Sequence, residues 1–248
     1  LILDSRRAGT PEYGLIDANR LINNFYIHDD HLVISKRAMD AAIQSFEAYT
    51  HMYRSVYLHP KARATDLQIA YALYYAYQSG ELDWIYNPSC EDLLSLWDGK
   101  LLALLEEVKD RRCKDLIDRY FKRDIFKCVY SMPIQRHALK LKKGIQGLKS
   151  DILRKIREAA IEDHHLVIDI MELKPPAPEP VDSDSLKRLQ FYDEDSGELV
   201  PFEGEKFKYV LELLTRSSEL RVYTLKEFEK HVKTACKELF ERNNEVVI

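Results

Sequence analysis

Cysteine is scarce in this sequence, with four residues among 248, and none of them forms a CxxC pair. Scattered single cysteines match neither the spacing of a structural zinc site nor the framework of a disulfide-stabilised fold. This scarcity predicts a protein of a reducing compartment, which we take to be the cytoplasm. The four positions are Cys90, Cys113, Cys128 and Cys236.

Long apolar runs are also missing. Charged residues interrupt each hydrophobic stretch well before the roughly 20 residues that a membrane-spanning helix requires. The first residues include Asp4, Arg6 and Arg7, which do not fit a signal peptide. The net charge of −4 gives no overall attraction to nucleic acid or to an anionic membrane, so net charge does not support a nucleic-acid partner. The sequence therefore predicts a soluble protein that does not bind membranes.

Several common catalytic motifs are absent, namely GxxxxGK[ST], GxGxxG, HExxH and GxSxG. The hydrophobic residues, 46% of the chain, are nevertheless sufficient for one sizeable core and a smaller second one.

The chain opens Leu-Ile-Leu-Asp without an initiator methionine and closes Glu-Val-Val-Ile like the start of a strand. We therefore expect it to be part of a longer protein.

Helical periodicity dominates the first two thirds of the sequence, where apolar residues recur every three or four positions. Pro60 should end or restart the first long helix. Two short β-rich runs, 25–27 and 32–34, flank a polar turn and predict a hairpin. The expected helices cover residues 37–58, 65–78, 90–108 and 136–157.

The pattern changes near residue 160. Four prolines between residues 174 and 180 cannot continue a helix or a central strand. The sequence thus predicts a mainly α fold, with a helical lobe at residues 1–160 and a small α+β lobe at residues 161–248. The elements expected in the second lobe are strands at 165–171 and 220–223, a hairpin at 189–202, and helices at 207–214 and 225–241.

Tyr49, Tyr53 and Tyr57 are spaced at i, i+4 and i+8, so a helix places them along one stripe. Phenol rings can stack on a base or sugar while their hydroxyl groups reach phosphate oxygens. Packing against a neighbouring tyrosine-rich helix is the alternative, and spacing alone favours it. That helix carries Tyr71, Tyr74, Tyr75 and Tyr77.

Three polar groupings invite a metal or phosphate interpretation, and each has a simpler one. His28-Asp29 occupies the predicted hairpin turn, without further ligands at a recognisable spacing. His164-His165 follows Asp163 and is interpreted as the polar entry to a strand. The basic stretch at residues 136–157 also contains acidic residues, so it is interpreted as a solvated helix face.

His59, Arg63 and Asp66 share one helical face. That face could present a cation supported by a carboxylate. A surface ion pair explains the spacing equally well.

Two segments carry a family resemblance. The run Asp4-Ser-Arg-Arg-Ala-Gly9, continued by Tyr13-Gly-Leu-Ile-Asp17 and Arg20-Leu-Ile22, resembles the RDxxxxG…YGxIDxxRLI segment of HD-domain deoxynucleoside triphosphate triphosphohydrolases. The run from Met52 to Asp66 is similar to the MYxxVYxHxxxRxxE helix of that family. Arg123-Asp-Ile-Phe-Lys127 resembles its RxLFK element, and Leu220-Arg-Val-Tyr223 resembles a C-terminal strand of its sterile-alpha-motif-containing members.

The resemblance implies a C-terminal portion of an HD phosphohydrolase, with a PDEase-like helical lobe. The family hydrolyses a dNTP to a deoxynucleoside and triphosphate, using a divalent metal held by His, His-Asp and Asp ligands. Those ligands would precede Leu1, so the resemblance implies that this chain contributes no metal ligand and no catalytic residue. It would supply a pocket wall for a nucleotide and surfaces for a homo-oligomer, a dimer or tetramer.

The resemblance also implies roles for individual residues. Asp4 would face the sugar 3′-hydroxyl, and Tyr53 and Tyr57 would line the sugar and base pocket. Arg20 and Arg221 would lie near nucleotide-dependent assembly sites. Further candidates for substrate or phosphate contact are Tyr49 and Arg54.

Tyr49 stands where the family has an arginine that grips the triphosphate, and a neutral phenol supplies no charge-assisted bidentate contact. Ser55 and Leu225 also stand at basic positions of the family. These departures leave open an alternative of a different class, a non-catalytic regulatory module that binds single-stranded nucleic acid or a partner protein. The retained Asp4, Tyr53 and Tyr57 favour the enzyme.

Overall fold

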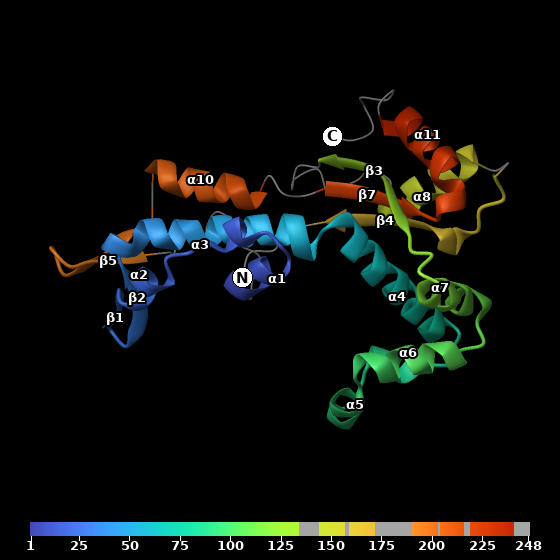
Figure 1. Cartoon of the computed structure of the whole chain (residues 1–248), viewed down its shortest axis with the longest axis horizontal. Coiled ribbons are helices and arrows are strands. Elements are labelled where there is room, and N and C mark those ends of the chain that lie inside the picture. The colour runs from blue at the N-terminus through green and yellow to red at the C-terminus, as the bar shows by residue number, and fades with distance from the viewer. Residues whose placement is uncertain (134–143, 157–158, 172–189, 203, 216–218, 241–248) are drawn as a thin grey trace. The chain divides into compact units, whose positions relative to one another are not determined.

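The computed structural model describes residues 1–133, 144–156, 159–171, 190–202, 204–215 and 219–240 (Figure 1). The chain divides into two compact units, and each combines segments that are distant in sequence. Unit 1 is built mainly from Leu1–His59 and Met171–Glu219. Unit 2 is built from Pro60–Met132, Ala138–Ile170 and Leu220–Ile248. The boundary near residue 160 stays a prediction.

Unit 1 combines the long helix α3 with a four-stranded sheet of order β1-β2-β5-β6. Strand β2 pairs antiparallel with β1 and parallel with β5, where Ile34 lies opposite Phe191. Helix α10 packs along α3 (Figure 1). The elements are α1 (Ile2–Arg7), α2 (Ala18–Ile22), β1 (Phe25–His28), β2 (His31–Ser35), α3 (Met39–Met52), a π-helical turn (Tyr53–Tyr57), β5 (Gln190–Asp193), β6 (Glu198–Pro201) and α10 (Gly204–Thr215).

Both predicted hairpins of unit 1 are confirmed. In the first, Asp29 and Asp30 have positive φ angles of 48° and 60°, which a tight two-residue turn between twisted strands requires. In the second, β5 pairs antiparallel with β6. The core of unit 1 joins α3 to the sheet and α10 through Ala42, Tyr49, Phe191, Phe202 and Val210.

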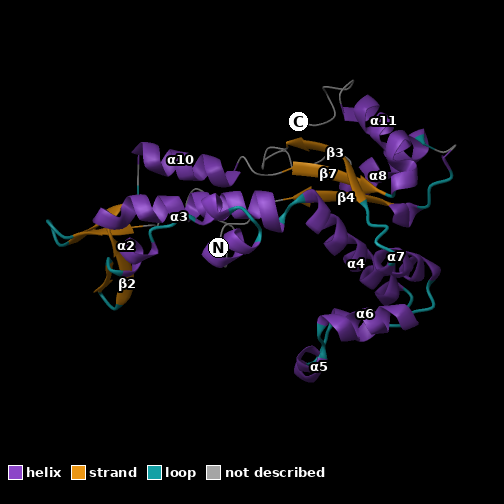
Figure 2. Cartoon of the chain, viewed as in Figure 1, coloured by secondary structure: helices purple, strands orange, loops and turns teal. Residues whose placement is uncertain are grey.

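Unit 2 packs helices against a three-stranded sheet of order β3-β7-β4 (Figure 2). Gln68 is one of its buried polar residues. The Nε2 atom of that residue donates to the Leu116 carbonyl (3.0 Å), and its Oε1 atom accepts from the Phe126 N–H (3.1 Å). The elements are α4 (Pro60–Gln78), α5 (Cys90–Ser95), α6 (Asp98–Glu107), α7 (Arg111–Phe121), β3 (Lys127–Pro133), α8 (Gly144–Lys155), β4 (Leu166–Met171), β7 (Glu219–Thr224) and α11 (Glu229–Phe240).

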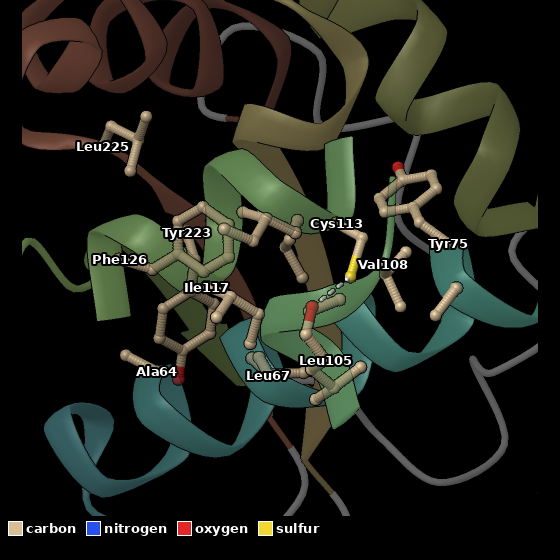
Figure 3. Close-up of a cluster of buried hydrophobic side chains, with 14 of the residues drawn as sticks. Ala64, Leu67, Tyr75, Leu105, Val108, Cys113, Ile117, Phe126, Tyr223 and Leu225 are labelled. Carbon is tan, nitrogen blue, oxygen red and sulfur yellow. Dashed lines mark hydrogen bonds between the residues drawn. The ribbon is translucent and has the colours of Figure 1, made fainter. Parts of the chain in front are cut away.

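Figure 3 shows the side chains that fill this core. They come from α4, from α6 and α7, and from β7. The Cys113 thiol lies 3.8 Å from the Leu105 carbonyl, so α6 and α7 meet through a buried side chain. The labelled residues include Leu67, Tyr75, Leu105, Val108, Cys113, Ile117, Phe126 and Tyr223.

The mainly α fold class with a small α+β part agrees with these elements, and the differences are local. The single helix expected at 90–108 is two helices, because the chain is extended at Leu96 and Trp97. Strand β3 was not predicted. The final helix begins at Glu229, after a short 3-10 turn. Residues 136–143 of the expected basic helix lie outside the described residues, and its remainder forms α8.

Each helix in the described ranges is too short or too polar to cross a lipid bilayer.

Candidate functional site

The three tyrosines of the predicted stripe do lie together in unit 1. The ring centroids of Tyr49 and Tyr53 are 4.2 Å apart, and those of Tyr53 and Tyr57 are 5.0 Å apart. Tyr49 belongs to α3, whereas the other two belong to the π-helical turn that follows. In that turn the Leu58 N–H donates to the Tyr53 carbonyl at 2.7 Å, one residue beyond the α-helical step. Turns of this kind are frequent at functional sites.

Asp4 joins this stripe from α1. The Tyr57 hydroxyl group donates a hydrogen bond to Asp4 Oδ2. That hydrogen bond, with burial, raises the pKa of Tyr57 to about 12, so the phenol stays neutral at physiological pH. Two residues that the sequence separates by 53 positions therefore meet in a half-buried contact.

Gly14 allows α1 to approach closely enough for this contact. A Cβ atom at position 14 would lie 2.1 Å from Ser5 Oγ and 3.1 Å from the Ile2 backbone. Ser5 is buried, and its hydroxyl group donates to the Ile2 carbonyl at 2.9 Å. Only a residue without a side chain fits at position 14 with this backbone.

Tyr49 differs from its two neighbours in burial. It is 8% exposed and belongs to the core of unit 1, and burial together with a hydrogen bond of its neutral phenol to Tyr53 raises its pKa. Tyr53 and Tyr57 are only partly buried. The stripe therefore has a packed end, at Tyr49, and an accessible end, at Tyr53 and Tyr57. Packing describes the first residue, and binding can involve only the other two.

The predicted arginines lie in different surroundings. Arg20 is exposed, and its guanidinium group donates to the Arg37 carbonyl from Nε (3.1 Å) and Nη2 (2.6 Å). Arg54 is exposed on the π-helical turn. Arg221 is 5% exposed in β7 of unit 2. A role for these residues in nucleotide contact stays a prediction.

Arg63 has a carboxylate partner that spacing did not indicate. Its Nε and Nη2 atoms donate to the two oxygens of Asp169 on β4, at 2.8 and 2.9 Å. Asp169 is buried, and this hydrogen-bonded pair raises the pKa of Arg63. The predicted ion pair lay on one helical face. The observed ion pair instead joins α4 to β4, because the partner of Arg63 lies 106 residues away.

His28 is the last residue of β1, and Asp29 is the first residue of the hairpin turn. The His28 Nε2 and Asp29 Oδ2 atoms are 3.6 Å apart, and the Asp29 side chain is 91% exposed. In the part of the chain that the structure describes, these residues belong to no group of three potential metal ligands.

His164 and His165 precede β4 as predicted, but they also converge on a third residue. Asp115 Oδ2, on α7, lies 3.3 Å from His164 Nε2 and 2.7 Å from His165 Nε2. Burial lowers the pKa of His164, and the adjacent His165 reinforces this effect. Burial alone would raise the pKa of Asp115, but its hydrogen bond from His165 and the charge of Arg119 lower it. Local spacing gives no signal for this cluster, because Asp115 is about 50 residues away.

The divalent metal implied by the family resemblance does not fit the residues around Asp4. The contact of Asp4 with Tyr57, beside Tyr53, offers one carboxylate and two phenol groups, whereas the resemblance implies histidine and aspartate ligands. Within the described residues, one cluster offers three ligand atoms within 4.8 Å of one another, namely Asp115, His164 and His165.

Comparison with solved structures shows two similar folds. A hypothetical protein from Aquifex aeolicus matches 95% of this chain with a TM-score of 0.63 and 17% identity, over 55% of its own length. A phosphohydrolase from Bacteroides thetaiotaomicron matches 91% with a TM-score of 0.58 and 19% identity, over 59% of its length.

The curated relative YwfO of Bacillus subtilis, described as uncharacterized, is 23% identical over 137 residues. These residues are 49% of this chain and 32% of YwfO, so the chain spans well under two thirds of the proteins it resembles. The sequence profile of the HD associated region matches residues 16–246. The chain therefore belongs to the HD associated region family.

Proposed function

We propose that this chain forms one wall of the substrate pocket in an HD-superfamily, metal-dependent phosphohydrolase that acts on dNTP-like nucleotides. The observation that carries the proposal is the contact of Tyr57 with Asp4, beside Tyr53. The similar fold of a phosphohydrolase from Bacteroides thetaiotaomicron supports the reaction class. We further propose a homo-oligomer, dimer or tetramer, with Arg20, Arg54 and Arg221 as nucleotide contacts.

In this proposal the Asp4 carboxylate accepts a hydrogen bond from the sugar 3′-hydroxyl. Tyr57 holds that carboxylate in place, and its raised pKa keeps it a neutral donor. Tyr53 offers a partly exposed ring to the sugar or base. A divalent metal bound by ligands from the rest of the protein would polarise the phosphoryl group. The residues described here bind and orient the nucleotide.

The test uses the complete protein that contains this segment, with dNTPs and Mg²⁺ or Mn²⁺, and measures released triphosphate and deoxynucleoside. We expect hydrolysis, and we expect Asp4→Asn to raise KM by about tenfold or more, as loss of a charge-assisted hydrogen bond does. Tyr209→Phe is the matched control, because Tyr209 donates to Glu47 on the exposed face of α3. Absence of turnover with every nucleotide, or equal effects of both variants, would contradict the proposal.

The isolated 248-residue chain gives a second test. Because we assign the metal ligands to other parts of the protein, this chain should release no triphosphate from any dNTP with added divalent metal. Turnover by the isolated chain would show that this assignment is wrong.

One observation favours a second function, a regulatory module without turnover. Tyr49 replaces the arginine that grips triphosphate in the resembling family, and it is buried in the core of unit 1. Such a module would bind single-stranded nucleic acid through its basic residues. Filter binding at two salt concentrations tests this, because phosphate-driven binding weakens steeply as salt rises.

A further inference from the structure

We propose that Asp115, His164 and His165 in unit 2 form a binding site for one zinc-class transition-metal cation. Two imidazoles with one carboxylate are a donor set that suits Zn²⁺ or Co²⁺ better than Mg²⁺ or Ca²⁺, which prefer oxygen ligands. The inference does not depend on the proposed phosphohydrolase function.

The separations between the ligand atoms suit a single ion. Ligands at the usual zinc bond lengths of about 2.0–2.2 Å in a tetrahedron are roughly 3.3 Å apart. His164 Nε2 and Asp115 Oδ2 are 3.3 Å apart, and His165 Nε2 and Asp115 Oδ2 are 2.7 Å apart. The ligand atoms of His164 and His165 lie within 4.8 Å of each other, so small shifts of the two rings would place all three groups around one cation. Asp115 is partly exposed, so water can reach a fourth position.

Surrounding contacts hold the two histidines in position. The Thr224 hydroxyl group on β7 donates to the His165 carbonyl at 2.9 Å, and the His165 N–H donates to the Glu162 carbonyl at 3.0 Å. The His165 ring stacks on Phe228 with centroids 5.8 Å apart, and the His164 ring packs edge-on against Tyr75 at 6.2 Å. Ligands fixed by packing in this way lose little freedom when a metal binds.

Around the cluster, the charge of Arg119 opposes a cation and three further carboxylates favour one. Arg119 donates from Nε to both Asp115 oxygens, at 3.1 and 3.2 Å, which orients the carboxylate. Its positive charge is shared with two further carboxylates, those of Asp124 and Glu227. Glu162 Oε2 lies 3.7 Å from His164 Nδ1, the position of an outer carboxylate that supports a metal-bound imidazole.

Both imidazoles of the cluster face the carboxylate through Nε2, and Nδ1 of His165 lies on the other side of its ring. His165 is 7% exposed, and its Nδ1 atom has no hydrogen-bond partner among the described residues. Both histidines instead direct Nε2 toward the same Asp115 oxygen. Two imidazoles that face one carboxylate oxygen through the same ring atom give an arrangement in which a cation can bind all three groups.

The experiment titrates the chelator-treated chain with ZnCl₂ and CoCl₂, and measures stoichiometry by calorimetry, thermal unfolding and the visible absorption of Co²⁺. We expect one equivalent to bind and raise the unfolding temperature, and we expect millimolar Mg²⁺ not to replace it. His164→Asn and His165→Asn should each weaken binding by more than about 100-fold, beyond the loss expected for an outer-shell partner. His231→Asn, on the exposed face of α11, is the control and should bind as the unmodified chain does.

Asp115→Asn separates metal binding from folding, because its amide oxygen still accepts a hydrogen bond from either histidine. We expect this variant to keep the far-ultraviolet circular dichroism of the unmodified chain and to lose tight Zn²⁺ binding. Unchanged zinc affinity in Asp115→Asn and His165→Asn, or the absence of any bound zinc in the unmodified chain, would overturn the proposal and leave a hydrogen-bonded packing cluster.

Discussion

Asp110 precedes α7 and caps its first turn. Its Oδ1 atom accepts from the backbone N–H groups of Arg112 (2.9 Å) and Cys113 (3.2 Å), and its Oδ2 atom accepts from Arg112 Nη2 (2.8 Å). The hydrogen bond with the Arg112 side chain is the main cause that lowers the pKa of Asp110. One short side chain therefore satisfies helix donors and orients a neighbouring cation.

Replacing Asp110 gives a prediction with a defined pH dependence. Asp110→Ala should lower the free energy of unfolding by about 1 kcal/mol at pH 7, because a cap is lost. The native pKa lies below the unfolded value, so the charge-dependent part is complete above pH ~4 and is lost as the pH falls through the native pKa. Urea denaturation at neutral and acidic pH measures both parts.

Asp110→Asn is the control, since asparagine caps helices about as well as aspartate but carries no charge. It should retain most of the stability at pH 7. An equal loss in both variants that does not change with pH would contradict this account of Asp110.

Gly14 provides a second test at a single position. Gly14→Ala should destabilise unit 1 by about 1–3 kcal/mol, because the new methyl group overlaps buried Ser5. Gly99→Ala is the control: its Cβ would also meet a side chain, at 1.9 Å, but that side chain is exposed Trp97, which can move. Thermal unfolding of both variants checks the prediction, and an equal loss in the two would refute it.

The salt bridge between α4 and β4 connects two elements through one partly buried pair, Arg63 with Asp169. Arg63→Ala should lower the free energy of unfolding by about 3 kcal/mol, because it leaves the Asp169 carboxylate buried without its partner. The double variant Arg63→Met with Asp169→Leu should recover most of this loss. A double-mutant cycle in urea measures the coupling, and additive losses would show that the pair does not act as a unit.

Local patterns predicted most helices, the first hairpin and the tyrosine stripe, because their periodicity is a property of neighbouring residues. They did not predict β3, whose partner β7 lies far along the chain. For the same reason they assigned Arg63 no specific distant partner and did not connect Asp115 with the histidines. Long-range contacts leave little trace in the spacing of one sequence.

The site shows the same limit. Family resemblance, and not spacing, suggested that Asp4 belongs with Tyr57, and the structure does place these two side chains in contact. Spacing alone favoured packing over binding for the tyrosines, and only the resemblance favoured the pocket. The different burial of Tyr49 and of its two neighbours became visible only when α3 was packed against the sheet.

All four cysteines belong to unit 2, so they can report on its opening. Burial raises the pKa of the Cys113 and Cys236 thiols to about 12, whereas Cys90 is exposed. At pH 7 we expect a maleimide to label Cys90 quickly and to label Cys113 and Cys236 only when unit 2 unfolds. Mass spectrometry of peptides over time checks this. Labelling of Cys113 at the rate of Cys90 would show that the core of unit 2 opens freely.

The parallel pairing of β2 with β5 has a consequence for how the chain must be made. Lys36, directly after β2, and Asp193, the last residue of β5, are 157 positions apart, yet they form an ion pair at 3.0 Å. When synthesis has reached only α4, β5 does not yet exist. The edge of β2 is then unpaired, and the apolar side of α3 is exposed. Any cut that removes β5 leaves the same surfaces open, and such amino-terminal fragments should aggregate instead of folding.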